Sequence, residues 1–440
     1  MTHSVESQLP QCFRLRQHFA SLAVDDVRQS VDAAIGNSTL ASRLRPGQSV
    51  GIAVGSRGIA DLPTIVSAVV DFIKRCGGVP VIVPAMGSHG GATAEGQAAL
   101  LRSLGIEEAA VGCEIRSSLD TIVVGTSTAG LEVHFDKIAS QMDHVVVLNR
   151  IKPHTRLVGR YESGLAKMLM IGLGKHQGAI VYHQAMADAD YCLDAMAAEI
   201  VPMIQAAAPI SLGLAIIEDA FDQVSHVEAV EPAEFLATEP RLLAMARERM
   251  PQLPFDHVDL LIVDRIGKEI SGTGMDTNVV GRKWNDKVAA ADEFPKVKQI
   301  YVRDLSDKSA GNAAGIGVAE FCHRRVIEKI DYDKTRINCL TSMHASAGAV
   351  PIHFDSDREA LIAATGQVGK RTREQLRWVW IRDTLDLSEL VCSEAYWDEI
   401  ATDGDAIGRE PSGVDLQPLS NLEPLKFDNE GNLQPMLEIG

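Results

Sequence analysis

The sequence lacks the features of membrane proteins, nucleic-acid-binding proteins and disulfide-stabilised proteins. It contains no apolar run of about 18 residues that could cross a bilayer. Its formal net charge is −17, from 42 lysines and arginines against 59 aspartates and glutamates. This balance weighs against nucleic acids, which need a basic surface, and against anionic membranes. The seven cysteines are scattered, with no CxxC pair, which favours reduced thiols over a disulfide framework.

We expect no secretory signal peptide, because MTHSVESQLP has no charged region followed by an apolar core. The apolar fraction of 46% and the charged fraction of 23% are ordinary for a globular protein. A chain of 440 residues has room for two or three domains. We therefore expect a cytoplasmic protein that acts on small molecules, since basic residues in a cleft can bind an anion whatever the overall charge.

Short β-rich runs alternate with helical segments, which predicts an α/β fold with largely parallel sheets. Helices are expected at residues 62–75, 93–104 (with Thr93 as the N-cap), 177–200 and 239–250. Strands are expected at residues 49–54, 79–83, 121–124, 145–148 and 210–217, and again at 260–263, 299–302, 337–340 and 379–382.

A break near residues 249–254 follows a charged helix and contains two prolines. It predicts an N-terminal cofactor-binding domain at residues 1–255 and a C-terminal α/β domain at 256–402. The tail at residues 403–440 is rich in glycine, proline, aspartate and asparagine. We expect it to be a loop or an extension that wraps back on the N-terminal domain. We expect the active site in a cleft between the two α/β domains.

Polar motifs follow three strands of the first domain. They contain Arg57, the pair Ser88–His89, and His154. Ligands in open α/β sheets bind at the carboxyl ends of the strands, so these motifs should share one edge of the sheet. The second domain repeats the pattern with Lys268, Asp276, Asn278, Arg282 and Lys283.

The segment at residues 149–183 concentrates reactive side chains. His154 follows a proline, Lys167 follows a Ser-Gly turn that includes Gly164, and His183 comes 16 positions after the lysine. On a straight helix Lys167 and His183 would lie about 24 Å apart. Glycines at 172 and 174 break that line, so the chain can bring both side chains to one centre.

Other residues compete for roles in this region. Lys175 follows Gly-Leu-Gly, which resembles an anion-binding loop, but His176 stands where a P-loop has serine or threonine. A histidine, lysine or arginine on a surface is often only solvated. Arginine also binds carboxylates through two hydrogen bonds, and this favours a substrate-binding role for the arginines of the motif loops. These are Arg57, Arg156, Arg160 and Arg282.

The ordered set His89, Pro153-His154, Ser163-Gly164-x-x-Lys167 and His183 resembles the nickel-pincer nucleotide-dependent lactate racemase family. The resemblance covers roughly residues 50–285, and the stretch at 266–282 is similar to a divergent hydroxy-acid racemase or epimerase branch. It implies a nickel pincer nucleotide, a pyridinium mononucleotide joined covalently to Lys167, with His183 as the ligand that the protein gives to nickel. His89 and His154 would be the acid and base on the two faces of the substrate carbon.

The resemblance also implies which residues surround the cofactor and the substrate. Candidate cofactor-binding residues are Lys167, Arg57, Ser88, Gly164, Asp276 and Asn278. Candidate substrate-binding residues are Arg156, Arg160, Arg282, Lys268 and Lys283. The implied partners are a small hydroxy acid and the enzymes that make the cofactor, and an assembly of identical copies is left open. Protein made without those enzymes would lack the cofactor.

The chain departs from the family near the substrate. Gly90 follows His89 where the family has arginine, Leu165 replaces the second glycine of the lysine motif, and the segment from His154 to Lys167 is about three residues longer. We therefore expect a more acidic or larger hydroxy acid than lactate. Two alternatives stay open. One is a zinc-dependent hydrolase or lyase that uses His89, His154 and His183, and the other is a nickel- or cofactor-binding protein without catalysis.

Overall fold

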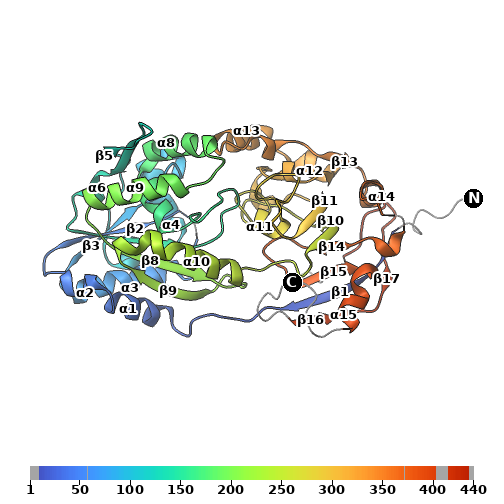
Figure 1. The fold of residues 1–440 in the computed structure, drawn as a ribbon, viewed down its shortest axis with the longest axis horizontal. Coiled ribbons are helices and arrows are strands. Elements are labelled where there is room, and N and C mark those ends of the chain that lie inside the picture. The colour runs from blue at the N-terminus through green and yellow to red at the C-terminus, as the bar shows by residue number, and fades with distance from the viewer. Residues whose placement is uncertain (1–8, 57, 371, 403–414, 436–440) are drawn as a thin grey trace, which may run out of the picture. The chain divides into compact units, whose positions relative to one another are not determined.

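The computed structural model describes residues 9–56, 58–370, 372–402 and 415–435. Arg57 and parts of the tail therefore lie outside the described residues. The chain forms two compact units (Figure 1). The first consists of Met1–Ala20 and Pro251–Gly440, and the second of Ser21–Met250. We call them the split unit and the central unit, and describe each by itself.

The central unit is built on a sheet in the order β4-β3-β2-β7-β8-β9. All neighbouring strands are parallel except the β8–β9 pair. Its strands are β2 (Ser49–Val54), β3 (Val79–Pro84), β4 (Glu114–Ile115), β7 (His144–Arg150), β8 (Ile210–Glu218) and β9 (Val224–Val230). The hairpin of β5 (Thr121–Thr126) and β6 (Glu132–Asp136) forms a separate two-stranded sheet.

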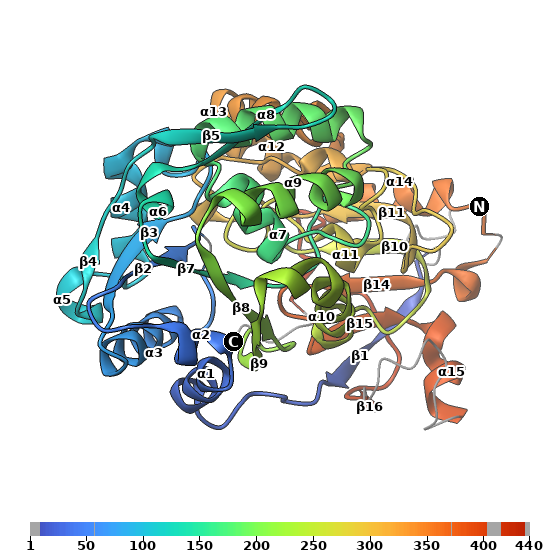
Figure 2. The same ribbon diagram turned by 60° about the vertical axis from the view of Figure 1, so that its left-hand side comes forward.

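Helices cover both faces of this sheet, which explains why its central strands are almost continuously apolar. Val145 and Val147 of β7 pack on one side, while Val146 and Leu148 pack on the other. Figure 2 shows α1 and α3 on one side of the sheet and α8 and α9 on the other. The helices are α1 (Val27–Gly36), α2 (Thr39–Arg43), α3 (Leu62–Arg75), α4 (Ala94–Ser103), α5 (Glu108–Val111), α6 (Lys137–Ser140), α7 (Leu165–Lys167), α8 (Lys175–Asp188), α9 (Asp194–Ala207) and α10 (Phe235–Arg249).

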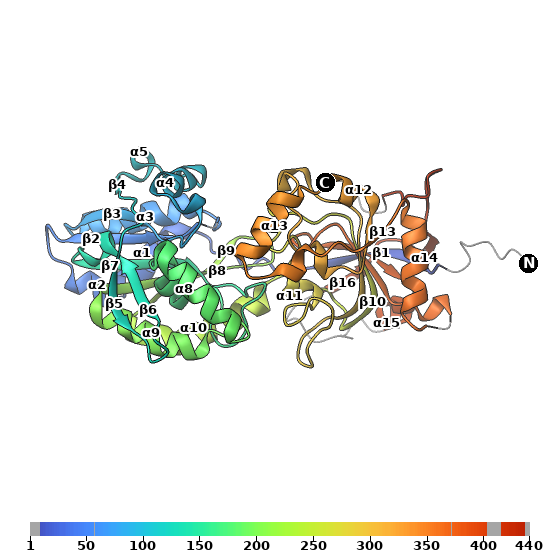
Figure 3. The same ribbon diagram turned by 90° about the horizontal axis from the view of Figure 1, so that it is seen from above.

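The split unit has a nine-stranded sheet, with the order β13-β12-β11-β10-β14-β15-β1-β16 and β17 also paired with β1. The run from β13 to β14 is parallel, and the strands beyond it are antiparallel. Its strands are β1 (Gln11–His18), β10 (His257–Val263), β11 (Lys296–Val302), β12 (Phe321–His323), β13 (Ile352–Phe354), β14 (Trp378–Ile381), β15 (Glu389–Ser393), β16 (Asp415–Pro418) and β17 (Glu423–Pro424). In Figure 3, α14 (Asp357–Gln367) runs beside β13. The other helices are α11 (Thr277–Val280), α12 (Arg324–Lys329), α13 (Tyr332–Thr341) and α15 (Trp397–Thr402).

The two chain ends meet in the split unit. β1 lies between β15 and β16, so residues near the N-terminus and in the tail complete one sheet. The sequence predicts a single domain at residues 1–255, whereas the structure groups residues 1–20 with 251–440. No local pattern reveals such a pairing, because its partners lie hundreds of positions apart in the chain.

The α/β fold class is confirmed, but two expected elements are wrong. Residues 337–340 form part of helix α13 and not a strand, and Thr335 and Cys339 are buried four positions apart, which is helical spacing. The single helix expected at residues 177–200 is divided into α8 and α9 by a turn in which Asp190 and Tyr191 have positive φ. In the part of the chain that the structure describes, no helix is long and apolar enough to span a membrane.

Candidate functional site

Three loops meet at the carboxyl edge of the central unit's sheet. They follow β2, β3 and β7, which are adjacent and parallel, as the sequence pattern predicted. The segment around Lys167, residues 164–172, contacts each of these three parts of the sheet edge. Asn149 Nδ2 donates to the Gly164 carbonyl at 2.8 Å, and the Gly87 N–H donates to the Gly172 carbonyl at 3.2 Å. A Cβ on Gly55 would lie 3.0 Å from the methyl group of Met168.

His89 lies in the loop after β3 and is exposed. Its Nδ1 is hydrogen-bonded to the hydroxyl of Ser56, from the loop after β2. Gly90 follows with φ of 68°, and a Cβ there would come within 2.6 Å of the Gly96 backbone. Glycine is therefore required at position 90. The neighbouring Ser88 is half-buried, and its carbonyl accepts the Ala92 N–H at 3.1 Å.

His154 is half-buried in the loop after β7. Its backbone N–H donates to Glu162 Oε2 at 2.6 Å, and its Nδ1 accepts the N–H groups of Arg156 at 3.0 Å and Leu157 at 3.1 Å. The side chain of Glu162 is fully buried and forms an ion pair with Arg247 of α10. Glu162 therefore connects the backbone of the His154 loop to α10.

Lys167 ends α7, a single helical turn that continues into the π-helical segment Met168–Gly172. Such irregular helices often mark functional positions. Glu239 of α10, which is buried, accepts the Ala166 N–H at 2.9 Å. A Cβ on Gly164 would lie 2.4 Å from Glu239 Oε1, so a larger residue there would have to displace the Glu239 carboxylate. Burial raises the pKa of Glu239 to about 7, against the opposing effect of the Ala166 and Leu165 N–H groups.

Lys167 and His183 lie within electrostatic reach of each other. Burial, and after it the charge of Lys167, lowers the pKa of His183. The neutral imidazole that results is the form that binds metals. The irregular segment after Lys167 thus brings together two residues that a straight helix would separate.

Lys175 is a structural residue in this fold. Its side chain and that of Asp136 are fully buried and form an ion pair at 2.8 Å, and its ammonium also contacts the Pro84 carbonyl. Burial lowers the pKa of Lys175, while Asp136 opposes that change. Its amine ties α8 to β3 and β6.

The substrate-binding candidates of the central unit lie in the loop between His154 and Lys167. The guanidinium of Arg156 is half-buried and stacks over the ring of Tyr191 at 4.2 Å. Arg160 is exposed, and its backbone N–H donates to Asp194 at 2.8 Å.

In the split unit, the structure does not leave Arg282 available as a substrate-binding residue. Its side chain is fully buried, pairs with Glu320 at 3.1 Å, and donates to the carbonyls of Asp286, Val297 and Lys298. It connects the loop after α11 to β11. A sequence motif alone does not show whether such an arginine stabilises the fold or contacts a ligand.

The other candidates of the split unit form local contacts. Asp276 is the N-cap of α11 and accepts from the backbone and side chain of Asn278. Lys268 contacts Asn338 at 2.8 Å, and the Lys283 N–H donates to Glu293 at 2.8 Å. Their roles in a cofactor or substrate site stay predictions.

The supporting residues Ser56, Glu162, Glu239 and Arg247 were not predicted from the sequence. Ser56 lies in the Gly55-Ser-Arg57-Gly58 motif and Glu162 directly precedes the Ser-Gly turn, but nothing in either motif distinguishes them from their neighbours. Glu239 and Arg247 belong to a charged helix far along the chain, where their burial and partners are invisible. Among the described residues, no group of three or more histidine, cysteine, aspartate or glutamate side chains is arranged to hold a metal ion.

Comparison with known proteins agrees with this architecture. Residues 12–192 match the family model of the lactate racemase N-terminal domain. The structure is similar to that of the lactate racemase apoprotein from Thermoanaerobacterium thermosaccharolyticum, with a TM-score of 0.50 and 13% identity, over 87% of this chain and 95% of that chain. A protein from Thermotoga maritima aligns with a TM-score of 0.43 and 14% identity, over 63% of this chain and 69% of that one. No curated protein matches the chain.

The protein is thus an α/β protein with the fold of lactate racemase. Within this fold, residues 12–192, which are less than half of the chain, are similar to the lactate racemase N-terminal domain. The resemblance drawn from the sequence is confirmed at this level.

Proposed function

We propose that the protein is a racemase or epimerase of 2-hydroxy acids that works with a nickel pincer nucleotide. At the family level, the lactate racemase relationship supports an isomerase with a nickel cofactor. The observation that carries the proposal is the proximity of Lys167 to His183, in a segment fastened to the loops of His89 and His154.

The side chains present fit this cofactor. By the resemblance, Lys167 would be joined to the pyridinium ring system and His183 would bind nickel. A half-buried amine beside a neutral imidazole supplies one nucleophile and one nitrogen ligand, as attachment and ligation require. Lys175 fits poorly, because its amine is buried against Asp136. When bound, the cofactor would supply the acceptor for the hydride at C2 of the hydroxy acid.

The chain's own residues bind the substrate and move its hydroxyl proton. By the resemblance, His89 and His154 would supply the two imidazoles that face the hydroxyl group of the substrate. The guanidinium of Arg156 lies over the ring of Tyr191, and in the proposed site it would bind a carboxylate of the substrate. Arg156 and Arg160 together favour a substrate with a second polar or anionic group, such as a sugar acid or a hydroxy diacid, over lactate.

The experiment that tests the proposal is production of the full chain together with the cofactor-making enzymes, followed by nickel analysis, intact mass and peptide mapping. We expect nickel and a covalent adduct on Lys167. The matched control is Lys167→Met, which should carry neither. Zinc without an adduct would favour the hydrolase or lyase alternative. Nickel with the adduct, but with no activity on any hydroxy acid, would indicate a binding protein.

A further inference from the structure

The two candidate proton-transfer histidines are held in different ways. Two backbone N–H groups, those of Arg156 and Leu157, point at Nδ1 of His154. An imidazole nitrogen that accepts hydrogen bonds cannot also carry a proton, so the neutral ring of His154 has its proton on Nε2. Adding a second proton at Nδ1 would break both hydrogen bonds and place a charged N–H against two donors.

This arrangement depends on the buried Glu162. Its Oε2 accepts the backbone N–H of His154 at 2.6 Å, while its Oε1 is paired with Arg247. The isolated bridge between Lys152 and Ser163 closes the same loop, with a backbone hydrogen bond of 3.0 Å. The backbone on both sides of His154 is therefore fixed, and with it the direction of the two N–H groups that face the ring.

His89 is bonded through Nδ1 to a hydroxyl group, that of Ser56. A hydroxyl can donate or accept. When Ser56 accepts the Nδ1 proton, the lone pair of the neutral His89 ring lies on Nε2. The ring can then take a second proton at Nε2 while it keeps its hydrogen bond to Ser56. The hydrogen bond at Nδ1 of His89 is compatible with an imidazolium ion, whereas the two hydrogen bonds at Nδ1 of His154 favour a neutral ring.

We propose that His154 meets the substrate as a neutral Nε2–H hydrogen-bond donor, with Glu162 as its positioning residue, and that His89 alone accepts the hydroxyl proton. This inference rests on the proposed function and divides the two roles that the family resemblance treats as equivalent. In the proton step, the substrate O–H bond breaks and an N–H bond forms at His89 Nε2. The products are an alkoxide and an imidazolium ion, and no other group is oxidised or reduced.

The direct test is ¹⁵N NMR of the full chain labelled in its histidines at neutral pH, which distinguishes protonated from unprotonated ring nitrogens. His323 is an internal reference, because its Nδ1 accepts the Arg325 N–H at 3.0 Å and its Nε2 lies 2.9 Å from Asn432 Oδ1. Spectra of His154→Asn and His323→Asn assign the two rings. We expect both to be neutral Nε2–H tautomers. An Nδ1–H or cationic His154 would overturn the inference without touching the proposed function.

Two further comparisons separate positioning from folding. Glu162→Ala should give His154 a mixture of tautomers, and Glu162→Gln, whose amide oxygen can still accept the backbone N–H, should restore the Nε2–H form. In the loaded protein, His89→Asn should lower kcat/KM by about 10²- to 10⁴-fold, as loss of a general base does. His154→Asn, which keeps an N–H donor, should lower it by about tenfold, as loss of one neutral hydrogen bond does. Equal losses would contradict the division of roles, whereas no turnover by the loaded wild type would instead reject the proposed function.

Discussion

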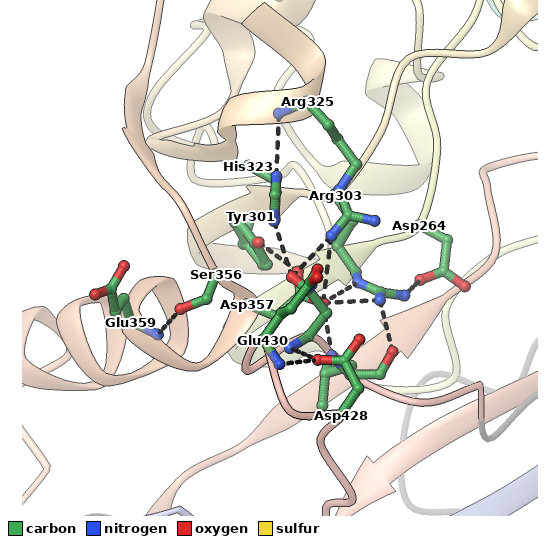
Figure 4. A network of polar contacts seen from close by, with 12 residues as sticks. Asp264, Tyr301, Arg303, His323, Arg325, Ser356, Asp357, Glu359, Asp428 and Glu430 are labelled. Atoms are coloured by element: carbon green, nitrogen blue, oxygen red, sulfur yellow. Dashed lines mark hydrogen bonds and ion pairs between the residues drawn. The ribbon is translucent and has the colours of Figure 1, made fainter.

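Each unit has a cluster of charged side chains near the carboxyl ends of its parallel strands. The two clusters differ in the groups that the buried carboxylates bind. In the split unit, Arg303 after β11 pairs with Asp357 at 2.8 Å and with Asp264, and Tyr301 donates to Asp357 at 2.6 Å (Figure 4). The tail completes the cluster, because the Leu433 N–H donates to Asp357 at 2.8 Å. Burial raises the pKa of Asp357, but the hydrogen bond and charge of Arg303, together with the hydrogen bonds from Tyr301 and Leu433, lower the pKa overall.

In the central unit, the buried carboxylates accept hydrogen bonds from backbone N–H groups of the candidate site. Glu162 holds the N–H of His154, and Glu239 holds the N–H of Ala166, one residue before Lys167. The reactive side chains themselves are half-buried or exposed. In the split unit, the paired charges of Arg303 and Asp357 stabilise the fold. In the central unit, Glu162 and Glu239 fix the backbone of the loops that carry the candidate site residues. The comparison predicts that substitutions in the first cluster affect stability and that those in the second affect chemistry.

The largest expected effect follows from Lys167→Ala. We expect complete loss of the covalent adduct, because the amine of the rival Lys175 is buried against Asp136. We also expect a change in Tm of no more than a few degrees, because the side chain of Lys167 is only half-buried. Intact mass and thermal unfolding of the same preparation measure both quantities. An adduct that persists on Lys175 would contradict the assignment.

Arg303→Met should show the opposite result. It leaves Asp357 buried without its main cation, which costs about 3–5 kcal/mol of the free energy of unfolding. Urea unfolding of the apo chain measures the loss. Arg324→Met provides the control, because Arg324 pairs with Asp355 through two side chains that are both more than half exposed, and such pairs contribute about 1 kcal/mol or less. The folded fraction of Arg303→Met should still form the Lys167 adduct. Loss of the adduct would contradict the conclusion that this cluster affects only stability.

The sequence predicted the strands and the candidate site residues better than the buried residues that support them. Apolar runs bounded by glycine and proline predicted most central strands, since burial on both faces of a parallel sheet leaves that pattern. The order of His89, His154, Lys167 and His183 predicted the candidate site and its family. Arg282 and Lys175 show the limit of motifs, because a basic residue after a glycine-rich turn has the same appearance whether it faces a ligand or a buried carboxylate. Glu162 and Glu239 could not be found, since their function depends on contacts made from distant segments.

Glu239 gives a pH-dependent test of the support behind Lys167. Its folded pKa of about 7 exceeds the ordinary glutamate value, so the folded state binds the proton more tightly than the unfolded state. Its contribution therefore favours folding at low pH and is lost as the pH rises from about 4.5 to 7. Glu239→Gln should stabilise the chain by a few kcal/mol at most at pH 8, with little change at pH 5. Equal effects at both pH values would show that Glu239 is not a protonated buried acid near neutrality.

The smallest expected effect concerns the choice of substrate. Arg156→Ala should reduce kcat/KM for a hydroxy diacid or sugar acid by roughly 10- to 100-fold more than for lactate, since the guanidinium reads the second polar group. Arg160→Ala is the matched control in the same loop, and its exposed side chain should give a weaker effect. A wild-type preference for lactate, or equal losses on both substrates, would reject this reading of the loop.

The central claim is that the protein interconverts the stereoisomers of a 2-hydroxy acid by moving a hydride at C2. The most direct measurement uses one stereoisomer deuterated at C2, given in ordinary water to the nickel-loaded chain with its Lys167 adduct, across a panel of lactate, hydroxy diacids and sugar acids. The account predicts that the opposite configuration appears at C2 and that the product retains its deuterium. No interconversion by the loaded protein, or exchange of the deuterium with solvent, would contradict it.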